Sequence, residues 1–97
     1  MLQLSVITRH TNAPASELHA LAERELQKVQ RFFRRPLRAE VVFSEERGFK
    51  HVEVRLHANG QEFIAKEKGE SFLQVLNQVA EILIRQLRKL KTRRSAR

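Results

Sequence analysis

The sequence predicts an α+β fold of two layers, in which two helices cover one face of a four-stranded, mostly antiparallel sheet. Three observations lead to this prediction. Apolar and polar residues alternate in four segments, which is typical of half-buried strands. Two longer segments repeat apolar residues at helical spacing, and the six segments follow the order β-α-β-β-β-α. A chain of 97 residues also has room for only one domain with a single core.

The first strand and the first helix are predicted within the N-terminal third of the chain. Residues 2–7 alternate, and the loop after them offers Asn12 as a helix N-cap and Pro14 as a residue suited to a first helical turn. The first helix is predicted over residues 16–33, and Pro36 ends it. Its apolar side consists of Leu18, Leu21, Ala22, Leu26, Val29, Phe32 and Phe33.

Three further strands are predicted in the middle of the chain. Residues 37–44, 51–58 and 61–68 alternate in the same way as the first segment. A turn around Gly48 separates the first two of them. The dipeptide Asn59-Gly60 separates the last two and is a strong signal for a tight hairpin. The outward face of the sheet is predicted to be polar and to stay in water.

The second helix is predicted near the C-terminus. Gly69 ends the last strand, and Ser71 is placed to cap a helix that runs to about Lys91. Its predicted core stripe consists of Phe72, Leu76, Val79, Ala80, Leu83, Leu87 and Leu90. We therefore expect one domain over residues 1–91, followed by a flexible basic tail over residues 92–97.

Positive charge is concentrated in this last segment. The formal net charge is +8, and residues 85–97 contain seven basic residues and no acidic one. Arg85, Arg88 and Lys89 fall together on the helix side opposite the core stripe. A solvated helix face usually mixes both signs, and the helix dipole accounts for one or two cations near a C-terminus but not for seven. The segment therefore predicts a binding surface for a polyanion.

A second basic cluster lies around the end of the first helix. No acidic residue occurs between Glu25 and Glu40, and the cations in this interval are Lys28, Arg31, Arg34, Arg35 and Arg38. If both helices cover one face of the sheet, the two clusters form one surface, which suits contact with a phosphate backbone. Tyr and Trp are absent, and the six Phe fall mostly on core positions. The pattern therefore disfavours readout of unpaired bases and favours structured RNA read by its shape.

Catalysis finds little support in the sequence. The four histidines are His10, His19, His51 and His57, and the chain has no Cys and no Asp to complete most triads or metal sites. His51 and His57 lie about 20 Å apart along one predicted strand, which is too far to share a metal. The three glycines are scattered, so they form no phosphate-binding loop. We expect no enzymatic activity, no cofactor, no metal and no small-molecule substrate.

The sequence also favours a cytoplasmic protein. The opening residues show no basic segment followed by an apolar one, so no signal peptide is predicted. No apolar run approaches the roughly 20 residues that a membrane-spanning helix needs. The lack of cysteine suits a reducing compartment. We therefore expect no membrane partner.

The element order and three segments resemble one known family. The segments "QLSVITRH", "LHANGQEFIAKEKGES" and "RQLRKLK" are similar to the short ribosome hibernation promoting factor and ribosome-associated inhibitor family. The resemblance implies a fold like that of the double-stranded-RNA-binding domain. It also implies binding to the small ribosomal subunit in the channel used by mRNA and tRNA, with translation silenced in stressed or resting cells. Arg85, Arg88, Lys89 and Lys91 match the basic positions of the family's last helix and would contact ribosomal RNA.

The expected RNA-binding residues come from both basic clusters. They are Arg85, Arg88, Lys89, Lys91, Arg93, Arg94, Lys28, Arg31, Arg34 and Arg35. The sequence departs from the family's pattern at Glu25, Leu73 and Ile82, where the resemblance implies basic or aromatic residues. These departures keep open an alternative function as a general structured-RNA-binding protein or RNA chaperone.

A third alternative is an interaction helix. A basic amphipathic helix is also typical of membrane surfaces and of protein partners. In addition, Leu73, Val75, Ile82 and Ile84 flank the core stripe and widen the apolar arc of the second helix beyond what a sheet needs to cover. We therefore expect weak self-association through part of this arc.

Overall fold

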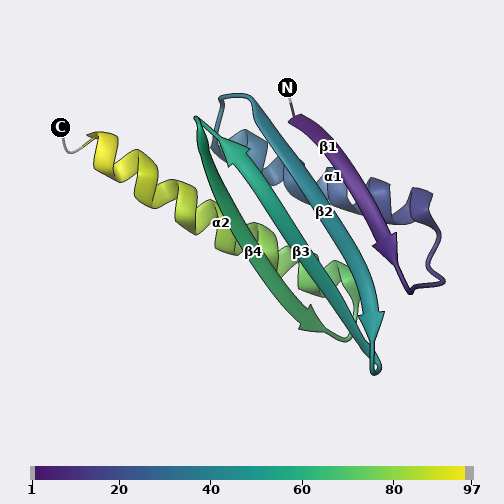
Figure 1. Cartoon of the computed structure of the whole chain (residues 1–97). Coiled ribbons are helices and arrows are strands. Elements are labelled where there is room, and N and C mark those ends of the chain that lie inside the picture. The colour runs from purple at the N-terminus through teal and green to yellow at the C-terminus, as the bar shows by residue number, and fades with distance from the viewer. Residues whose placement is uncertain (1, 96–97) are drawn as a thin grey trace.

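The chain folds into six elements in the predicted order (Figure 1). This computed structural model describes the backbone of residues 2–95 and the side chains of residues 2–90. The strands are β1 (Leu2–Arg9), β2 (Leu37–Glu46), β3 (Phe49–Ala58) and β4 (Gln61–Gly69). The helices are α1 (Ala15–Phe32) and α2 (Phe72–Ser95).

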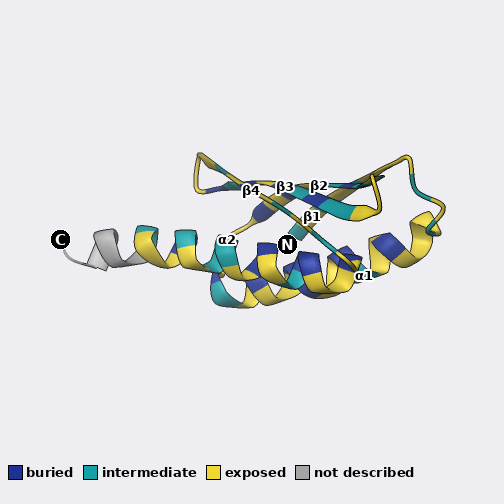
Figure 2. Cartoon of the chain, turned by 90° about the horizontal axis from the view of Figure 1, so that it is seen from below, coloured by how far each residue is buried: buried dark blue, intermediate teal, exposed yellow. Residues whose placement is uncertain are grey.

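The sheet has four strands in the order β1-β2-β3-β4. β1 pairs with β2 in parallel, whereas β2–β3 and β3–β4 are antiparallel. The parallel pair requires a crossover connection, which α1 provides, and the antiparallel pairs need only tight turns. Both helices lie on one face of the sheet, as Figure 2 shows. The predicted two-layer α+β fold is therefore confirmed.

Two tight turns connect the antiparallel strands. Asn59 and Gly60 have φ angles of 55° and 76°, and Arg47 and Gly48 have φ angles of 54° and 82°. Positive φ at both central residues is the mark of a type I′ turn, whose twist matches that of the flanking strands. The Asn59-Gly60 turn was predicted from its dipeptide. The other turn places an arginine where asparagine, aspartate or glycine is usual.

The core lies between the sheet and the two helices. Alternate residues of each strand face the helices, so that Val41, Val54 and Ala65 stand side by side across β2, β3 and β4. The ring of Phe72 in the first turn of α2 packs edge-on against Phe43, with 5.2 Å between ring centroids. The largest fully buried side chains are Phe43, Leu26, Leu37, Leu56, Leu76, Leu83, Leu87, Val29, Val41, Val52, Val54 and Val75. Burial of these residues fixes the faces that both helices turn to solvent.

The ends of the helices differ in part from the prediction. α1 begins at Ala15 with Pro14, not Asn12, at its N-cap, and no side chain caps it. The Pro14 carbonyl accepts hydrogen bonds from the backbone N–H groups of Glu17 and Leu18, both at 3.1 Å. The expected cap of α2 is confirmed, because the Ser71 hydroxyl accepts a hydrogen bond from the Gln74 N–H at 3.1 Å.

α2 is longer than the sequence predicted. It continues to Ser95 instead of ending near Lys91, and its last turns extend past the sheet (Figure 1). The apolar repeat stops at Leu90, which is half-buried, so the pattern held no signal for the last turn. Residues 96–97 and the side chains beyond Leu90 lie outside the described part of the chain. Flexibility of residues 92–97 therefore stays a prediction.

Candidate RNA-binding surface

The two basic clusters meet because of the way the helices run. α1 and α2 point in the same direction, so their C-terminal halves lie toward the same end of the molecule (Figure 1). Arg31 lies in the last turn of α1, and Arg85 and Lys89 lie in the C-terminal half of α2; all three are exposed. Arg31 also lies at the negative end of the α1 dipole. One end of the helical layer is therefore basic.

A direct contact joins the clusters. The guanidinium carbon of Arg88 on α2 lies 5.7 Å from the ring centroid of Phe32 on α1. Phe32 is itself half-buried against the core. An arginine over an aromatic face gains cation–π attraction, which is about 0.5–1 kcal/mol at an exposed site. Arg88 is therefore held beside the end of α1 and does not extend freely into solvent.

The loop after α1 is fixed by a single glutamine. The Gln30 side-chain amide donates hydrogen bonds to the carbonyl oxygens of Phe33, at 2.7 Å, and of Arg35, at 2.8 Å. The N–H of Phe33 in turn donates to the Val29 carbonyl at 2.9 Å. Arg34 and Arg35 are exposed on this ordered backbone. Their guanidinium groups therefore lose less conformational freedom on binding than those of a mobile loop would.

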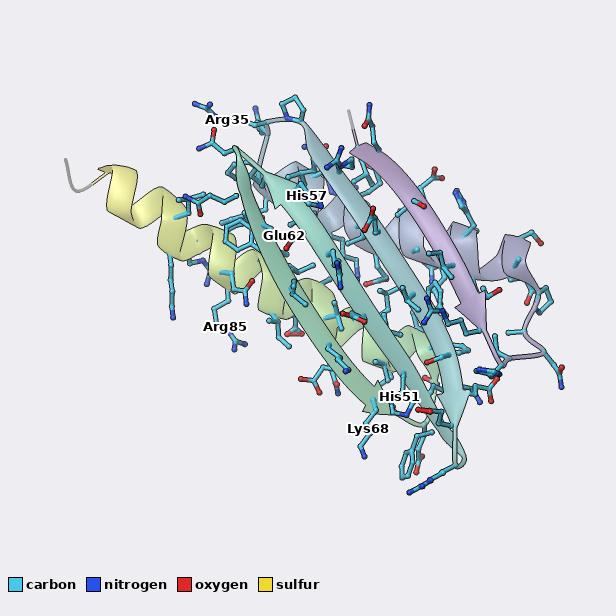
Figure 3. All side chains as sticks on the ribbon, viewed as in Figure 1. Arg35, His51, His57, Glu62, Lys68 and Arg85 are labelled. Atoms are coloured by element: carbon cyan, nitrogen blue, oxygen red, sulfur yellow. The ribbon has the colours of Figure 1, made fainter. Side chains whose placement is uncertain are left out.

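The cations of α2 are held by the core on the opposite side of the helix. Leu83 and Leu87 are completely buried, and Arg85 and Lys89 lie one turn apart on the exposed side. Figure 3 shows Arg85 extending from α2 into solvent. The spacing of these two charges is set by the helix, so α2 offers phosphates a fixed pair of donors.

Glu25 alters the contribution of Lys28. Its side chain is only 3% exposed, and the Lys28 ammonium pairs with its carboxylate at 2.9 Å. The Arg24 guanidinium approaches the same carboxylate at 3.9 Å. The structure therefore places a buried acid beneath the predicted basic surface, which sequence reasoning missed. The signal was present, because position 25 falls on the core stripe between Ala22 and Val29.

Other sequence-predicted cations lie elsewhere or outside the described side chains. Arg38 was expected to belong with the α1 cluster. It belongs instead to the outer face of the sheet, because its neighbours Leu37 and Ala39 are buried against the helices. In the strand register, Arg38 stands opposite His57 on β3. The side chains of Lys91, Arg93 and Arg94 lie beyond the described part of the chain. Their contribution to the surface stays a prediction.

The apolar side of α2 is used mainly for packing. Of the four flanking residues, Val75 is buried, Ile82 and Ile84 are half-buried against the core, and Leu73 is 44% exposed. The core stripe is buried from Phe72 to Leu87, so a membrane surface would have to displace the elements that cover it. No helix within the described residues is long and apolar enough to cross a membrane. The expected self-association would therefore have to rely on Leu73.

Glu45 and His57 form contacts between elements of the fold. The carboxylate of Glu45 accepts hydrogen bonds from the Thr11 hydroxyl and the Lys50 ammonium, and these lower the pKa of its carboxyl group. They tie the loop before α1 to the end of β2. His57 pairs with Glu62 across β3 and β4 at 3.4 Å. Over residues 2–90, no three His, Cys, Asp or Glu side chains gather as metal ligands would.

Comparison with known proteins identifies relatives of both sequence and fold. The family model described as "Sigma 54 modulation protein / S30EA ribosomal protein" matches residues 4–95. The fold is similar to the N-terminal domain of Protein Y from Thermus thermophilus, with a TM-score of 0.82 and 18% identity over 93% of this chain and 99% of that one. It is also similar to a ribosomal subunit interface protein from Coxiella burnetii, with a TM-score of 0.80 and 18% identity over 95% and 99%. No curated protein matches by sequence.

Proposed function

Because this chain belongs to the Sigma 54 modulation protein / S30EA ribosomal protein family, we propose that it binds the small ribosomal subunit and acts as a hibernation factor. In this role it occupies the channel used by mRNA and tRNA in the cytoplasm and inhibits translation under stress or in stationary phase. Its partner there is ribosomal RNA, whose phosphates are contacted by the basic ends of α1 and α2.

One observation carries the proposal. The contact between Arg88 and Phe32 holds the two basic clusters together at one end of the helical layer. The cations of this surface are anchored by the core through α2 and by Gln30 through the α1–β2 loop. A rigid array of cations suits a folded RNA, in which the phosphates are also fixed. The surface therefore supports recognition by shape and charge.

A second candidate function is general binding of structured RNA, or RNA chaperone activity. It is favoured by Glu25, which stands where the resemblance implies a basic residue. Its carboxylate pairs with Lys28 and so removes positive charge from the side of α1. Without a cation at this place, the protein lacks one contact that the resemblance implies for the ribosomal site. Its binding would then depend more on the phosphate contacts that any structured RNA offers.

Co-sedimentation with purified small subunits, with and without an excess of competitor duplex RNA, separates the two functions. A hibernation factor pellets with the subunits at equimolar ratio despite the duplex, whereas a general binder is displaced by it. The affinity should fall as salt rises, with a log–log slope of roughly −3 to −6 if about 4–7 phosphates are engaged. Absence of the protein from the pellet at low salt would contradict both functions.

Inhibition is tested separately in cell-free translation. The protein should stop synthesis when it is equimolar with ribosomes, because one molecule per small subunit fills the channel. If the protein binds subunits but leaves synthesis unchanged at this ratio, the result would support the ribosomal partner and refute the role in hibernation.

A further inference from the structure

Phe49 is exposed at the end of the β2–β3 hairpin. The chain has six phenylalanines. Phe33, Phe43 and Phe72 are buried, and Phe32 and Phe63 are half-buried against the core. Phe49, by contrast, is 43% exposed, although a ring of this size gains more than most side chains from burial. Core packing therefore does not account for this residue.

The turn that carries Phe49 has an unusual residue beside it. Arg47 occupies the first central position of the type I′ turn with a φ of 54°. This left-handed conformation is unfavourable for a residue with a Cβ, and asparagine, aspartate or glycine would fit it better. Arg47 is exposed, and no ion pair of its side chain occurs among the described residues. The turn therefore places an exposed arginine two residues before the exposed Phe49.

A lysine and a depression complete the surroundings of the ring. The Lys68 ammonium on β4 lies 5.1 Å from the centroid of Phe49. Lys68 pairs with His51 in the sheet register, and Figure 3 shows both near the hairpin end. A depression of about 240 Å³ opens on the same outer face of the sheet. Its polar lining consists of Arg9, Ser44, Glu46, His51, Glu53 and Lys66.

The register places this depression directly beside the ring. Glu46 pairs with Phe49 across the hairpin, and Ser44 pairs with His51. The hollow thus begins at the position next to the aromatic side chain on the outer face. On the outer face, the depression and the ring are bordered by the cations Arg9, Lys66 and Lys68 and by the carboxylates Glu46 and Glu53, and Arg47 lies in the adjoining turn.

This arrangement matches the chemistry of one nucleotide. An aromatic ring offers a stacking face to any base, and nearby cations attract the phosphate. Carboxylates and a serine hydroxyl can hydrogen-bond the ribose hydroxyl groups. We propose that the hairpin end of the outer sheet face binds an unpaired nucleotide of RNA, with its base stacked on Phe49. That this RNA is ribosomal rests on the proposed function, whereas the binding of a nucleotide rests on the side chains of the site itself.

The nucleotide site lies far from the basic surface of the helices. The molecule measures 48 × 23 × 18 Å, and Figure 3 shows Lys68 and His51 toward one end of its long axis and Arg35 and Arg85 toward the other. A ribosomal RNA that is engaged at both ends would be read by shape at the helices and by one unpaired base at the hairpin. The site therefore adds base readout to a protein that otherwise contacts phosphates.

The chain offers its own spectroscopic test, because it contains no Trp and no Tyr. The Phe49→Trp variant carries a single fluorophore at the proposed site. Ile64→Trp is the matched control, since Ile64 is 47% exposed on the same outer face but lies in the middle of β4. Titration with a single-stranded RNA octamer should quench the fluorescence of Phe49→Trp and leave that of Ile64→Trp unchanged. The same octamer in a duplex should quench much less.

Affinity measurements give a second readout. Phe49→Ala should bind small subunits about 5- to 100-fold more weakly than the wild type, which is the usual effect of losing one stacked base. The salt slope should stay unchanged, because no charge is lost, and Phe49→Trp should keep wild-type affinity. The nucleotide site would be refuted if the octamer leaves the fluorescence of Phe49→Trp unchanged, or if it quenches both tryptophan variants equally.

The outcomes also separate this inference from the proposed function. Wild-type protein that pellets with small subunits while Phe49→Ala binds them equally well would refute the nucleotide site alone. If the octamer quenches Phe49→Trp but the wild-type protein does not bind small subunits, the result would support the nucleotide site and refute the ribosomal role.

Discussion

At the scale of single residues, the buried carboxylate of Glu25 decides how much charge α1 offers to a ligand. It pairs with the ammonium of Lys28, whose side chain is itself 44% exposed, and leaves Arg31, Arg34 and Arg35 as the exposed cations near the end of the helix that have no acidic partner among the described residues. A buried carboxylate needs such a partner, because an unpaired charge in the interior is costly. Lys28 therefore contributes to stability more than to binding.

Alanine substitutions should show this division. Arg31→Ala should weaken binding to small subunits roughly tenfold, since a lost charged hydrogen bond is worth about 1.5–3 kcal/mol. Lys28→Ala should weaken it by less than about threefold and instead lower the free energy of unfolding by about 1–2 kcal/mol, because Glu25 loses its hydrogen-bonded partner and keeps only the more distant Arg24. Urea denaturation and subunit binding measure the two effects. Recovery of stability in Lys28→Ala/Glu25→Gln is the control, and equal binding losses for both alanine variants would contradict the account.

Glu45 makes stability depend on pH. The hydrogen bonds from Thr11 and Lys50 lower the pKa of its carboxyl below the ordinary value of 4.5. Between the two pKa values, Glu45 therefore binds a proton more readily in the unfolded chain than in the folded one. The stabilisation from its two hydrogen bonds is present above about pH 4.5 and is lost as pH falls through the pKa of the folded state. Thr11→Val should flatten the loss of stability in acid, measured by urea denaturation from pH 3 to 7. Thr8→Val is the matched control, and an unchanged acid profile in Thr11→Val would refute the coupling.

At the scale of elements, the sequence predicted nearly all of the fold, because each strand and helix has a clear apolar period. The turn at Asn59-Gly60 and the cap at Ser71 followed from residue types whose local geometry is specific. The prediction of Asn12 as the N-cap of α1 was wrong, because the backbone carbonyl of Pro14, and not a side chain, accepts the hydrogen bonds at the start of the helix. The end of α2 was missed, because the apolar repeat of the sequence stops at Leu90.

The candidate site was predicted less completely than the fold. That the two basic clusters adjoin followed from placing both helices on one face of the sheet. Arg38 was assigned to the wrong face by grouping residues along the chain instead of by strand alternation. Phe49 was missed for the same reason, since the period of β3 already turns position 49 outward. The contact between Arg88 and Phe32 depends on the distance between helices, which no sequence pattern specifies.

Truncation distinguishes the anchored part of α2 from its end. Deleting residues 92–97 should weaken binding to small subunits modestly and reduce the salt slope by no more than about 2–3, one unit for each lost phosphate contact. The core stays intact in this variant, because its anchors Leu83 and Leu87 precede the deletion. Binding is measured at several salt concentrations after circular dichroism has confirmed the fold. Complete loss of binding would make the end of α2 the main ligand-binding element.

At the scale of the whole molecule, two faces of different character are combined in one elongated fold. The helical layer carries a basic end, whereas the outer face of the sheet mixes cations with carboxylates such as Glu40 and Glu53. The net charge of +8 is thus not spread evenly over the surface. A polyanion is steered toward the end where α1 and α2 meet. We therefore expect the fixed cations at this end to determine binding.

The most direct test is the affinity of Arg85→Glu/Lys89→Glu for small ribosomal subunits at one fixed salt concentration. Both side chains are exposed, so the fold should survive and circular dichroism should be unchanged. Arg38→Glu/Arg55→Glu, on the opposite face, makes the same change in net charge and serves as the matched control. We expect at least about 100-fold weaker binding for the α2 variant, from two lost charged contacts, and a much smaller loss for the control. Equal affinities of the two variants would contradict it.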